Sequence, residues 1–268
     1  MAVRITYIGG PTALIEIDGL RLLTDPTFDP AGTDYFAKGY TLHKTTDPAL
    51  DAAQLGSIDA VLLSHDHHAD NLDTSGREFL SRVPHVLTTR QGAERLGGNA
   101  RGLAPWERFD LDAPDGKRLR VVATPARHGP VNGDRGPVIG FALAGSERRA
   151  VYVSGDTVWY EGVAEVARRF SVGLALLFMG AARVSVAGPA HLTLTASEAV
   201  TAAQAFDPAI IVPLHYEGWQ HFSESRADVD TAFARHHIAD RLAWLTPGAP
   251  HSFDLEPSRK IAGRLRAA

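Results

Sequence analysis

The chain has 268 residues, twelve histidines and no cysteine, and 27 Lys and Arg against 31 Asp and Glu give a formal net charge of −4. The lack of cysteine excludes disulfides, thiolate catalysis, Cys-based zinc sites and iron–sulfur clusters, but not a metal held by histidine and carboxylate. The mildly acidic balance, with no block of Lys and Arg, argues against nucleic acid as a partner.

Signals for membranes and secretion are also missing. No apolar run approaches the roughly 18 residues of a membrane span. The N-terminus MAVRITYIGG lacks the apolar core and the cleavage site of a signal peptide. We therefore expect a cytoplasmic protein without membrane insertion, acting on a small molecule.

The first part of the chain predicts strands and then a long loop. Short apolar runs at 3–9, 13–17 and 20–26 are separated by Gly, Pro and Asp, which is typical of an antiparallel meander. Residues 27–56 are less regular, and we expect a long loop with one short helix. A loop of this length is often a functional lid.

From residue 57 onward, buried strands alternate with helices. Thr195 and Glu198 form a capping box, which predicts a helix start. The pattern predicts a single domain over residues 1–268, a layered α/β sandwich rather than a barrel. By apolar periodicity we expect strands at 59–64, 86–89, 118–124, 138–143, 150–154, 174–180 and 209–215, and helices at 74–83, 90–97, 160–170, 195–206 and 225–237.

Histidine or aspartate lies at the end of four of these strands or within four residues after it. In open α/β sheets, ligands bind outside the carboxyl ends of strands, so we expect the four exits to form a single site. Imidazole and carboxylate suit zinc, manganese and iron. The predicted metal ligands are His65, His67, Asp70, His128, Asp156 and His215.

The spacing within the first exit suggests how the ligands divide. In an extended chain residues i and i+2 point to the same side, so His65 and His67 can hold one ion together, and His128 would complete a three-histidine face. His68 would then point the opposite way, which predicts that it is not a ligand. Asp70 and His215 could hold a second ion, with Asp156 as a bridge.

HxHxxD at His65–Asp70, a lone His128, the sequence SGDT around Asp156 and the late His215 together resemble the metallo-β-lactamase fold superfamily. The motifs YIGG, LLTDP and SHDHHADNLD are most similar to the branch with ascorbate-phosphate lactonase and N-acylphosphatidylethanolamine phospholipase D. The resemblance implies an αββα four-layer sandwich that holds one or two divalent ions, zinc or manganese before iron. It also implies hydrolysis by metal-bound hydroxide, and related enzymes often form homo-oligomers.

The sequence departs from that family at Asn71, where the family motif has a histidine that binds the second ion. An amide is a poor zinc ligand, and Asn71 could instead hold the loop through backbone groups. His191, just before the predicted helix 195–206, is a candidate replacement. It could be a metal ligand, a proton donor or a substrate contact, or it could be a capping or core histidine without a role in the site. Asp25 either forms a turn before proline or orients a ligand histidine.

Six polar and aromatic residues follow the predicted ligands and would lie at the mouth of the site. Each one alone could be ordinary packing, but together they suggest a pocket for a substrate with an apolar or ring-shaped part. They are Trp159, Tyr160, Tyr216, Glu217, Trp219 and His221.

We therefore expect a metal-dependent hydrolase that acts on a phosphodiester, a lactone or another ester. Asp70 would orient the attacking nucleophile, and His191 or a metal-bound water would supply the leaving-group proton. Two alternatives stay open: an iron-dependent redox protein on the same fold, and a non-catalytic metal-binding module. Asn71 is the feature that supports the latter.

Overall fold

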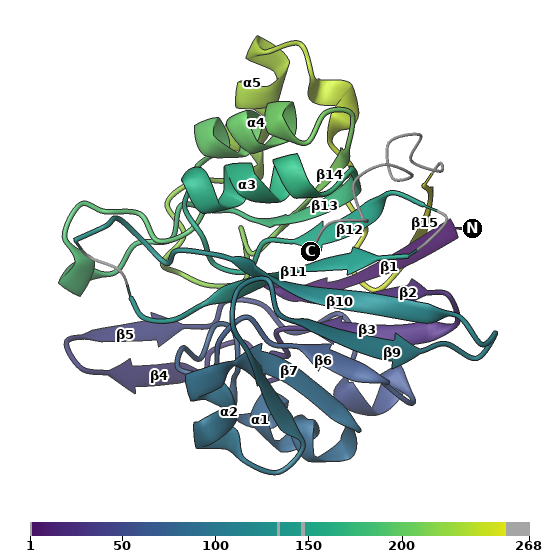
Figure 1. The fold of residues 1–268 in the computed structure, drawn as a ribbon. Coiled ribbons are helices and arrows are strands. Elements are labelled where there is room, and N and C mark those ends of the chain that lie inside the picture. Colours follow the sequence, from purple (N-terminus) through teal and green to yellow (C-terminus); the bar gives the residue numbers. More distant parts are fainter. Residues whose placement is uncertain (1, 133–134, 146–147, 256–268) are drawn as a thin grey trace.

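The computed structural model describes residues 2–132, 135–145 and 148–255. Two large sheets pack face to face, and helices cover their outer faces, in the order helix, sheet, sheet, helix (Figure 1). This confirms both the layered α/β arrangement predicted from the sequence pattern and the four-layer sandwich implied by the resemblance.

The first sheet contains the predicted meander and the first βα units. Its order is β15-β1-β2-β3-β6-β7-β8, antiparallel from β15 to β3 and parallel from β3 to β8. Helices α1 (Thr74–Phe79) and α2 (Arg90–Leu96) begin where Asp73 and Thr89 accept hydrogen bonds from backbone N–H groups three residues later. The strands are β1 (Ala2–Gly9), β2 (Thr12–Ile17), β3 (Leu20–Thr24), β6 (Ala60–Leu62), β7 (His85–Thr89), β8 (Ala100–Leu103) and β15 (Pro250–Asp254).

The second sheet has the order β14-β13-β12-β11-β10-β9, parallel from β12 to β14 and antiparallel elsewhere. Its outer face is covered by α3 (Glu161–Arg169), α4 (Ala196–Ala205) and α5 (Arg226–Arg235), and the predicted capping box starts α4. The strands are β9 (Arg108–Asp112), β10 (Arg118–Pro125), β11 (Ile139–Ala144), β12 (Ala150–Val153), β13 (Val172–Phe178) and β14 (Ile210–Leu214).

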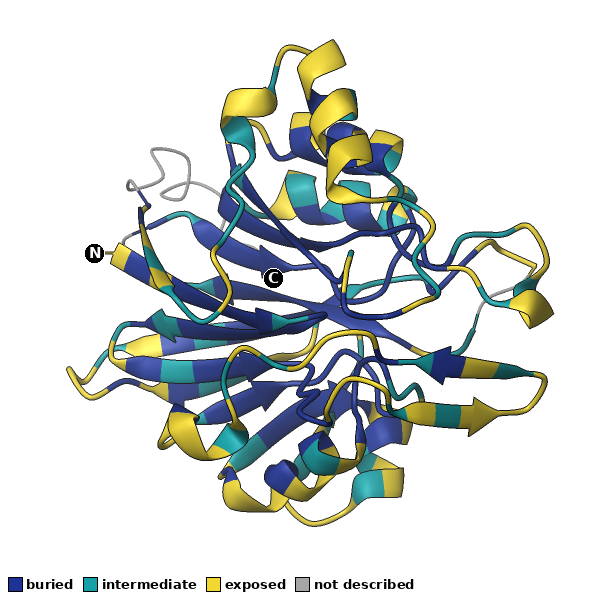
Figure 2. Ribbon diagram, turned by 180° about the vertical axis from the view of Figure 1, so that it is seen from behind, coloured by how far each residue is buried: buried dark blue, intermediate teal, exposed yellow. Residues whose placement is uncertain are grey.

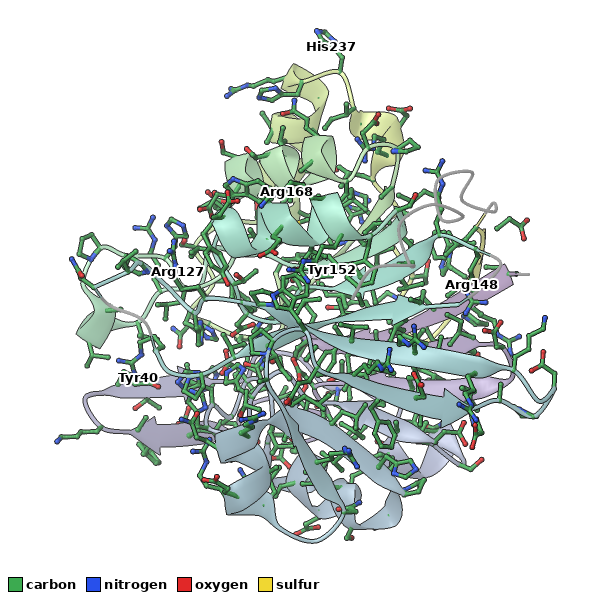
Figure 3. All side chains as sticks on the ribbon, viewed as in Figure 1. Tyr40, Arg127, Arg148, Tyr152, Arg168 and His237 are labelled. Atoms are coloured by element: carbon green, nitrogen blue, oxygen red, sulfur yellow. The ribbon has the colours of Figure 1, made fainter. Side chains whose placement is uncertain are left out.

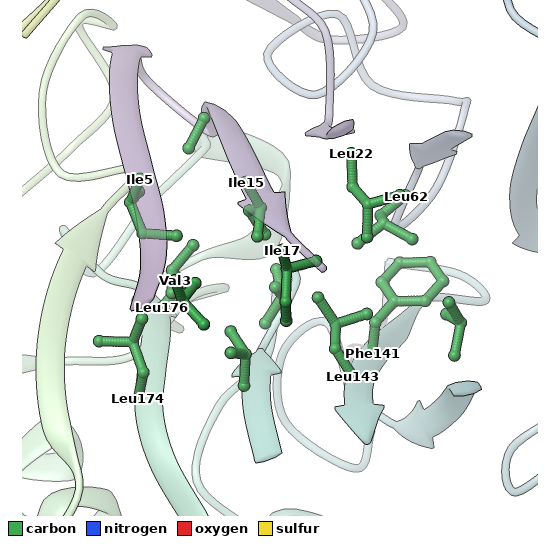
Figure 4. Close-up of a cluster of buried hydrophobic side chains, with 14 of the residues drawn as sticks. Val3, Ile5, Ile15, Ile17, Leu22, Leu62, Phe141, Leu143, Leu174 and Leu176 are labelled. Atoms are coloured by element: carbon green, nitrogen blue, oxygen red, sulfur yellow. The ribbon is translucent and has the colours of Figure 1, made fainter. Parts of the chain in front are cut away.

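Strand β13 shows how the layers are held together. All seven of its residues are buried, because both faces of the sheet are covered. Leu174 and Leu176 face the other sheet and pack near Val3 and Ile15 (Figure 4), whereas Leu177 belongs to the cluster under the helices. Burial is therefore concentrated in the two sheets, and exposed residues lie mainly on the outer helices and loops (Figure 2).

The prediction of a loop over 27–56 is wrong in part. The segment contains a small antiparallel hairpin, β4 (Asp34–Ala37) and β5 (Tyr40–His43), and a 3₁₀ helix, η1 (Ala52–Leu55). Directly after the hairpin, Lys44 is 3 % exposed and its Nζ lies 3.0 Å from Oδ2 of Asp73. A buried ion pair with a residue far along the chain is invisible to a local pattern.

Three further 3₁₀ helices occur in the connections: η2 (Leu80–Arg82), η3 (Ser185–Ala187) and η4 (Ala239–Arg241). Within the described ranges, none of the helices has the length and apolar content needed to cross a bilayer.

Candidate metal centre

The site is built where strands of both sheets end. His65 follows β6 of the first sheet, and His128, Asp156 and His215 follow β10, β12 and β14 of the second. All four side chains are buried. Ligand atoms of His65, His128 and Asp156 lie within 4.8 Å of one another. The structure thus brings together residues that are up to 150 positions apart, at the carboxyl ends of strands.

The turn after β12 depends on a glycine. Gly155 has φ = 59°, and a Cβ at this position would lie 2.7 Å from the carbonyl oxygen of Ile139 and 2.8 Å from Cβ of Ser64. Only glycine combines the left-handed conformation with this close approach. Gly155 therefore lets the loop that carries Asp156 reach the loop that carries His65.

Three imidazole nitrogens and one carboxylate oxygen form the core of the site. Nδ1 of His68 lies 3.0 Å from Nε2 of His65 and 3.0 Å from Nε2 of His128. Nε2 of His128 lies 3.4 Å from Oδ2 of Asp156. Ligands bound to zinc at 2.0–2.1 Å in a tetrahedron are about 3.3 Å apart, so these separations suit one divalent ion.

A second observation agrees with this fit. Oδ2 of Asp156, one of the four atoms at the core of the site, is buried and has no hydrogen-bond partner among the described residues. Buried polar atoms are nearly always satisfied, and a cation is one of the partners that explains an exception.

The orientation expected for His68 is wrong. Residues 63–71 form bends and turns rather than an extended strand, so side chains do not alternate, and His68 turns into the cluster. Nε2 of His67, on an exposed side chain, lies 3.0 Å from the carbonyl oxygen of Arg135. Its ring still has a ligand atom within 4.8 Å of His65 and His68.

A second group, rich in charge, adjoins the first. Oδ2 of Asp70 lies 3.5 Å from Nε2 of His215 and 3.0 Å from Nε2 of His221. Nδ1 of His215 lies 2.9 Å from Oδ1 of Asp156. His221 was expected only at the mouth of the site, yet it contacts Asp70 directly. Its position six residues after His215 was the one sequence signal, and it was too weak to assign a contact.

The two groups differ in protonation. Burial, together with the neighbouring histidines, lowers the pKa of His65 well below its usual range and that of His68 to about 3. Burial would also lower the pKa of His215, but Asp156 and Asp70 raise it to about 10. Burial would raise the pKa of Asp70, but hydrogen bonds from His215 and His221 hold it well below its usual range. His65 and His68 are therefore neutral imidazoles, whereas the second group is a charged network.

Asp25 supports the first group through an intermediate. It accepts hydrogen bonds from the Ser64 backbone N–H at 2.5 Å and from the Ser64 hydroxyl at 2.7 Å, and that hydroxyl lies 2.9 Å from Nδ1 of His65. Burial raises the pKa of Asp25 to about 7. The expected orienting carboxylate is thus present, although it acts through Ser64.

Asn71 is engaged with carboxylates. Its Nδ2 donates to Oδ2 of Asp25 and to Oδ1 of Asp156, each at 3.3 Å. The expectation that it bonds backbone groups is therefore not met by these contacts. The amide N–H group points at Asp156 from the position where the family motif has a ligand histidine.

The pocket beside these groups is an open concavity, and the space of about 270 Å³ within it is continuous with bulk solvent. Polar residues of the site line it together with mainly apolar residues from β5 and from the segment after β13. The lining residues are Tyr40, Leu42, His68, Asp70, His128, Arg135, Ala182, Val184, Leu192 and His221.

Several residues expected near the pocket lie elsewhere. Nε2 of His191 is 3.0 Å from Oε2 of Glu198 at the start of α4, and His191 does not line the pocket. Trp159, Tyr160 and Tyr216 pack against the hydrophobic cluster beneath the outer helices. Trp219 is buried beside Tyr35. Of the six mouth residues, only His221 is part of the lining, which does not include Glu217.

Comparison with known proteins places this geometry in a family. The model of the beta-lactamase superfamily domain matches residues 20–216. A metal-dependent hydrolase from Ignicoccus hospitalis is 27% identical over 233 residues, which cover 84% of this chain and 86% of that protein. The N-acyl-phosphatidylethanolamine-hydrolyzing phospholipase D 1 of Caenorhabditis elegans is 28% identical over 173 residues, 57% of this chain and 46% of that protein.

Solved structures share the fold at lower identity. An isothiocyanate hydrolase from Delia radicum gut bacteria has a TM-score of 0.79 and 23% identity, over 93% of this chain and 99% of that one. CmlA, a diiron β-hydroxylase from Streptomyces venezuelae, has a TM-score of 0.66 and 17% identity, over 94% of this chain and 54% of that one. Fold, matched domain and His/Asp cluster together identify a metal-dependent hydrolase. The chain belongs to the beta-lactamase superfamily, with the metallo-β-lactamase fold.

Proposed function

We propose that one divalent ion binds between Nε2 of His65, Nδ1 of His68, Nε2 of His128 and Oδ2 of Asp156. The observation that carries this proposal is the set of separations of 3.0, 3.0 and 3.4 Å among these atoms. Metal ligands must be unprotonated, and the low pKa values of His65 and His68 meet that condition. His67 would join only by giving up its contact with Arg135.

A second, weaker ion would be held by Asp70 and His215, with Asp156 between the two positions. His215 already contacts the carboxylates of Asp70 and Asp156. Asn71 donates an N–H group to Asp156 and thus offers no lone pair to a second ion at this position. The first ion is therefore bound more tightly. Imidazole and carboxylate ligands favour zinc or manganese, with iron as the third candidate.

The reaction that this site supports is hydrolysis of a phosphodiester, a lactone or another ester of a small molecule. When bound, the ion would supply an acidified water and would polarise the carbonyl or phosphoryl oxygen of the substrate. Asp70 stays ionised in its contacts with His215 and His221, so it can orient the attacking water and accept its proton. His191 remains our candidate for the leaving-group proton, which would require its ring to turn away from Glu198.

The test combines metal content with turnover. The purified chain is loaded with zinc or manganese, its metal is quantified by mass spectrometry, and bis(p-nitrophenyl) phosphate and a lactone panel are assayed. We expect tight metal and hydrolysis, both lost in His65→Ala and Asp156→Asn. His237→Asn is the matched control, since His237 lies at the far tip of the molecule (Figure 3). Tight metal without turnover on any ester contradicts the hydrolase, and oxygen consumption with bound iron would favour the redox alternative.

A further inference from the structure

Arg135 places a guanidinium group at the pocket. It lines the pocket together with His68, Asp70 and His128. Among the residues that the structure describes, no carboxylate lies within ion-pair distance of its side chain, and its Nε is buried without a hydrogen-bond partner. A buried donor without a hydrogen-bond partner raises the free energy of the folded protein. A ligand that accepts a hydrogen bond from Arg135 would remove this penalty.

The position of Arg135 is fixed by its neighbours. Its backbone N–H donates to the carbonyl oxygen of His128 at 2.9 Å, and its own carbonyl oxygen lies 3.0 Å from Nε2 of His67. The guanidinium carbon lies 5.6 Å from the centre of the Tyr40 ring. A planar guanidinium held against an aromatic ring is preorganised to bind a carboxylate or a phosphate with two parallel hydrogen bonds.

The charge balance of the pocket points the same way. Among the residues that line the pocket, Asp70 carries the one carboxylate and Arg135 the one guanidinium, and Asp70 already contacts His215 and His221. The charge of Arg135 then remains in excess. In a partly desolvated pocket, an excess positive charge favours an anionic ligand.

Apart from the residues of the site and Arg135, the lining of the pocket is mainly apolar. Leu42 is 4 % exposed and Leu192 is 4 % exposed. They line the pocket beside Tyr40, Ala182 and Val184. Because the pocket opens to solvent, an apolar group of a ligand can enter it and cover this part of the lining.

We propose that the substrate is a small amphiphilic anion, whose carboxylate or phosphate binds the guanidinium of Arg135 while a short apolar group packs on Tyr40, Leu42 and Val184. This inference rests on the proposed function for the bond that is cleaved. Arg135 would act in binding and leave the metal ligands unchanged. Arg135 would therefore make the affinity of the pocket higher for anionic esters than for neutral esters.

The test measures the binding of two probes, butylphosphonate and pentanoate, to the metal-loaded chain by calorimetry. Arg135→Gln should weaken binding by about 10- to 100-fold, because a charge-assisted hydrogen bond is lost. Arg135→Lys should restore part of it. The matched control is Arg127→Gln: Arg127 stacks on Tyr160 (4.5 Å), donates from Nε to the Gly129 carbonyl oxygen, and does not line the pocket. Figure 3 labels Arg127 and Tyr40 in the same region of the molecule.

Chain length and metal content complete the design. From methyl- to butylphosphonate, affinity should rise about three- to fourfold per methylene, and the tighter of the phosphonate and carboxylate probes identifies the anion. Equal binding by wild type and Arg135→Gln, or no dependence on chain length, overturns the proposal. Arg135→Gln should retain its metal, which shows that the loss of probe binding does not come from a loss of the ion. If no variant hydrolyses any ester but Arg135 still governs probe binding, the proposed function fails and the anion site stands.

Discussion

The two groups of the metal centre differ in charge and in protonation. His65, His68 and His128 bring three imidazoles together beside one carboxylate oxygen, that of Asp156, and burial keeps His65 and His68 neutral. Asp70, Asp156 and His215 instead form a charged network in which His215 carries a proton at neutral pH. A cation can bind to the unprotonated nitrogens of His65 and His68 directly. In the second group, a cation must first displace the proton of His215. The two positions should therefore differ in metal affinity and in its dependence on pH.

The largest effect is expected from His65→Ala. This removes a nitrogen at the centre of the first group, and even partners that only orient metal ligands contribute about 10- to 100-fold to affinity. We expect at least a 100-fold loss in affinity for the first ion and a matching loss of hydrolysis. Metal is quantified by mass spectrometry after dialysis, and circular dichroism checks the fold. Full metal content in folded His65→Ala would contradict the assignment.

The adjacent histidines His67 and His68 offer a sharper comparison. Because Nδ1 of His68 lies 3.0 Å from both His65 and His128, His68→Ala should weaken the first ion by about 100-fold. Nε2 of His67 contacts a backbone oxygen instead, so His67→Ala should change affinity by less than about tenfold. Competition with a chromogenic chelator measures both variants side by side. The reverse order of effects would restore the pairing of His65 with His67 predicted from sequence.

The pH dependence of metal binding should separate the two groups. The pKa of His215 is raised to about 10, so an ion that binds its Nε2 at pH 7 must displace a proton. Affinity for the second ion should rise about tenfold per pH unit between pH 6 and 9. The first ion should show a much weaker slope, because His65 and His68 have already lost their protons at pH 6. Titration with manganese at four pH values tests this, and equal slopes would remove the distinction.

The smallest effect is expected at the support of His65. Ser64→Ala removes the hydroxyl between Asp25 and Nδ1 of His65 and leaves the buried Asp25 with one partner fewer. We expect a loss of about tenfold in affinity for the first ion, at the lower end for groups that orient a ligand. Thr201→Ala, an exposed hydroxyl on α4, serves as the control. An unchanged affinity in Ser64→Ala would show that packing alone holds His65.

Much of the architecture was predictable because its signals are local. The apolar alternation of β1 to β3, the buried run of β13 and the capping box of α4 each depend on neighbours within a few residues. The hairpin β4–β5 was missed because its strands are four residues long. Strand β15 pairs with β1 although the two strands lie near opposite ends of the sequence. A local sequence pattern cannot predict such a pairing.

The sequence by itself determined that histidine and aspartate lie at the ends of four buried strands in a chain without cysteine. This was possible because runs of apolar residues indicate where a buried strand ends. Tertiary structure decided which atoms meet. A turn at 63–71 brings His68 into the cluster, and a loop after β14 carries His221 to Asp70. It also decided that His191 faces Glu198 and that Arg135 faces the pocket. The direction of a side chain in a turn depends on backbone dihedrals and distant packing, which residue spacing does not encode.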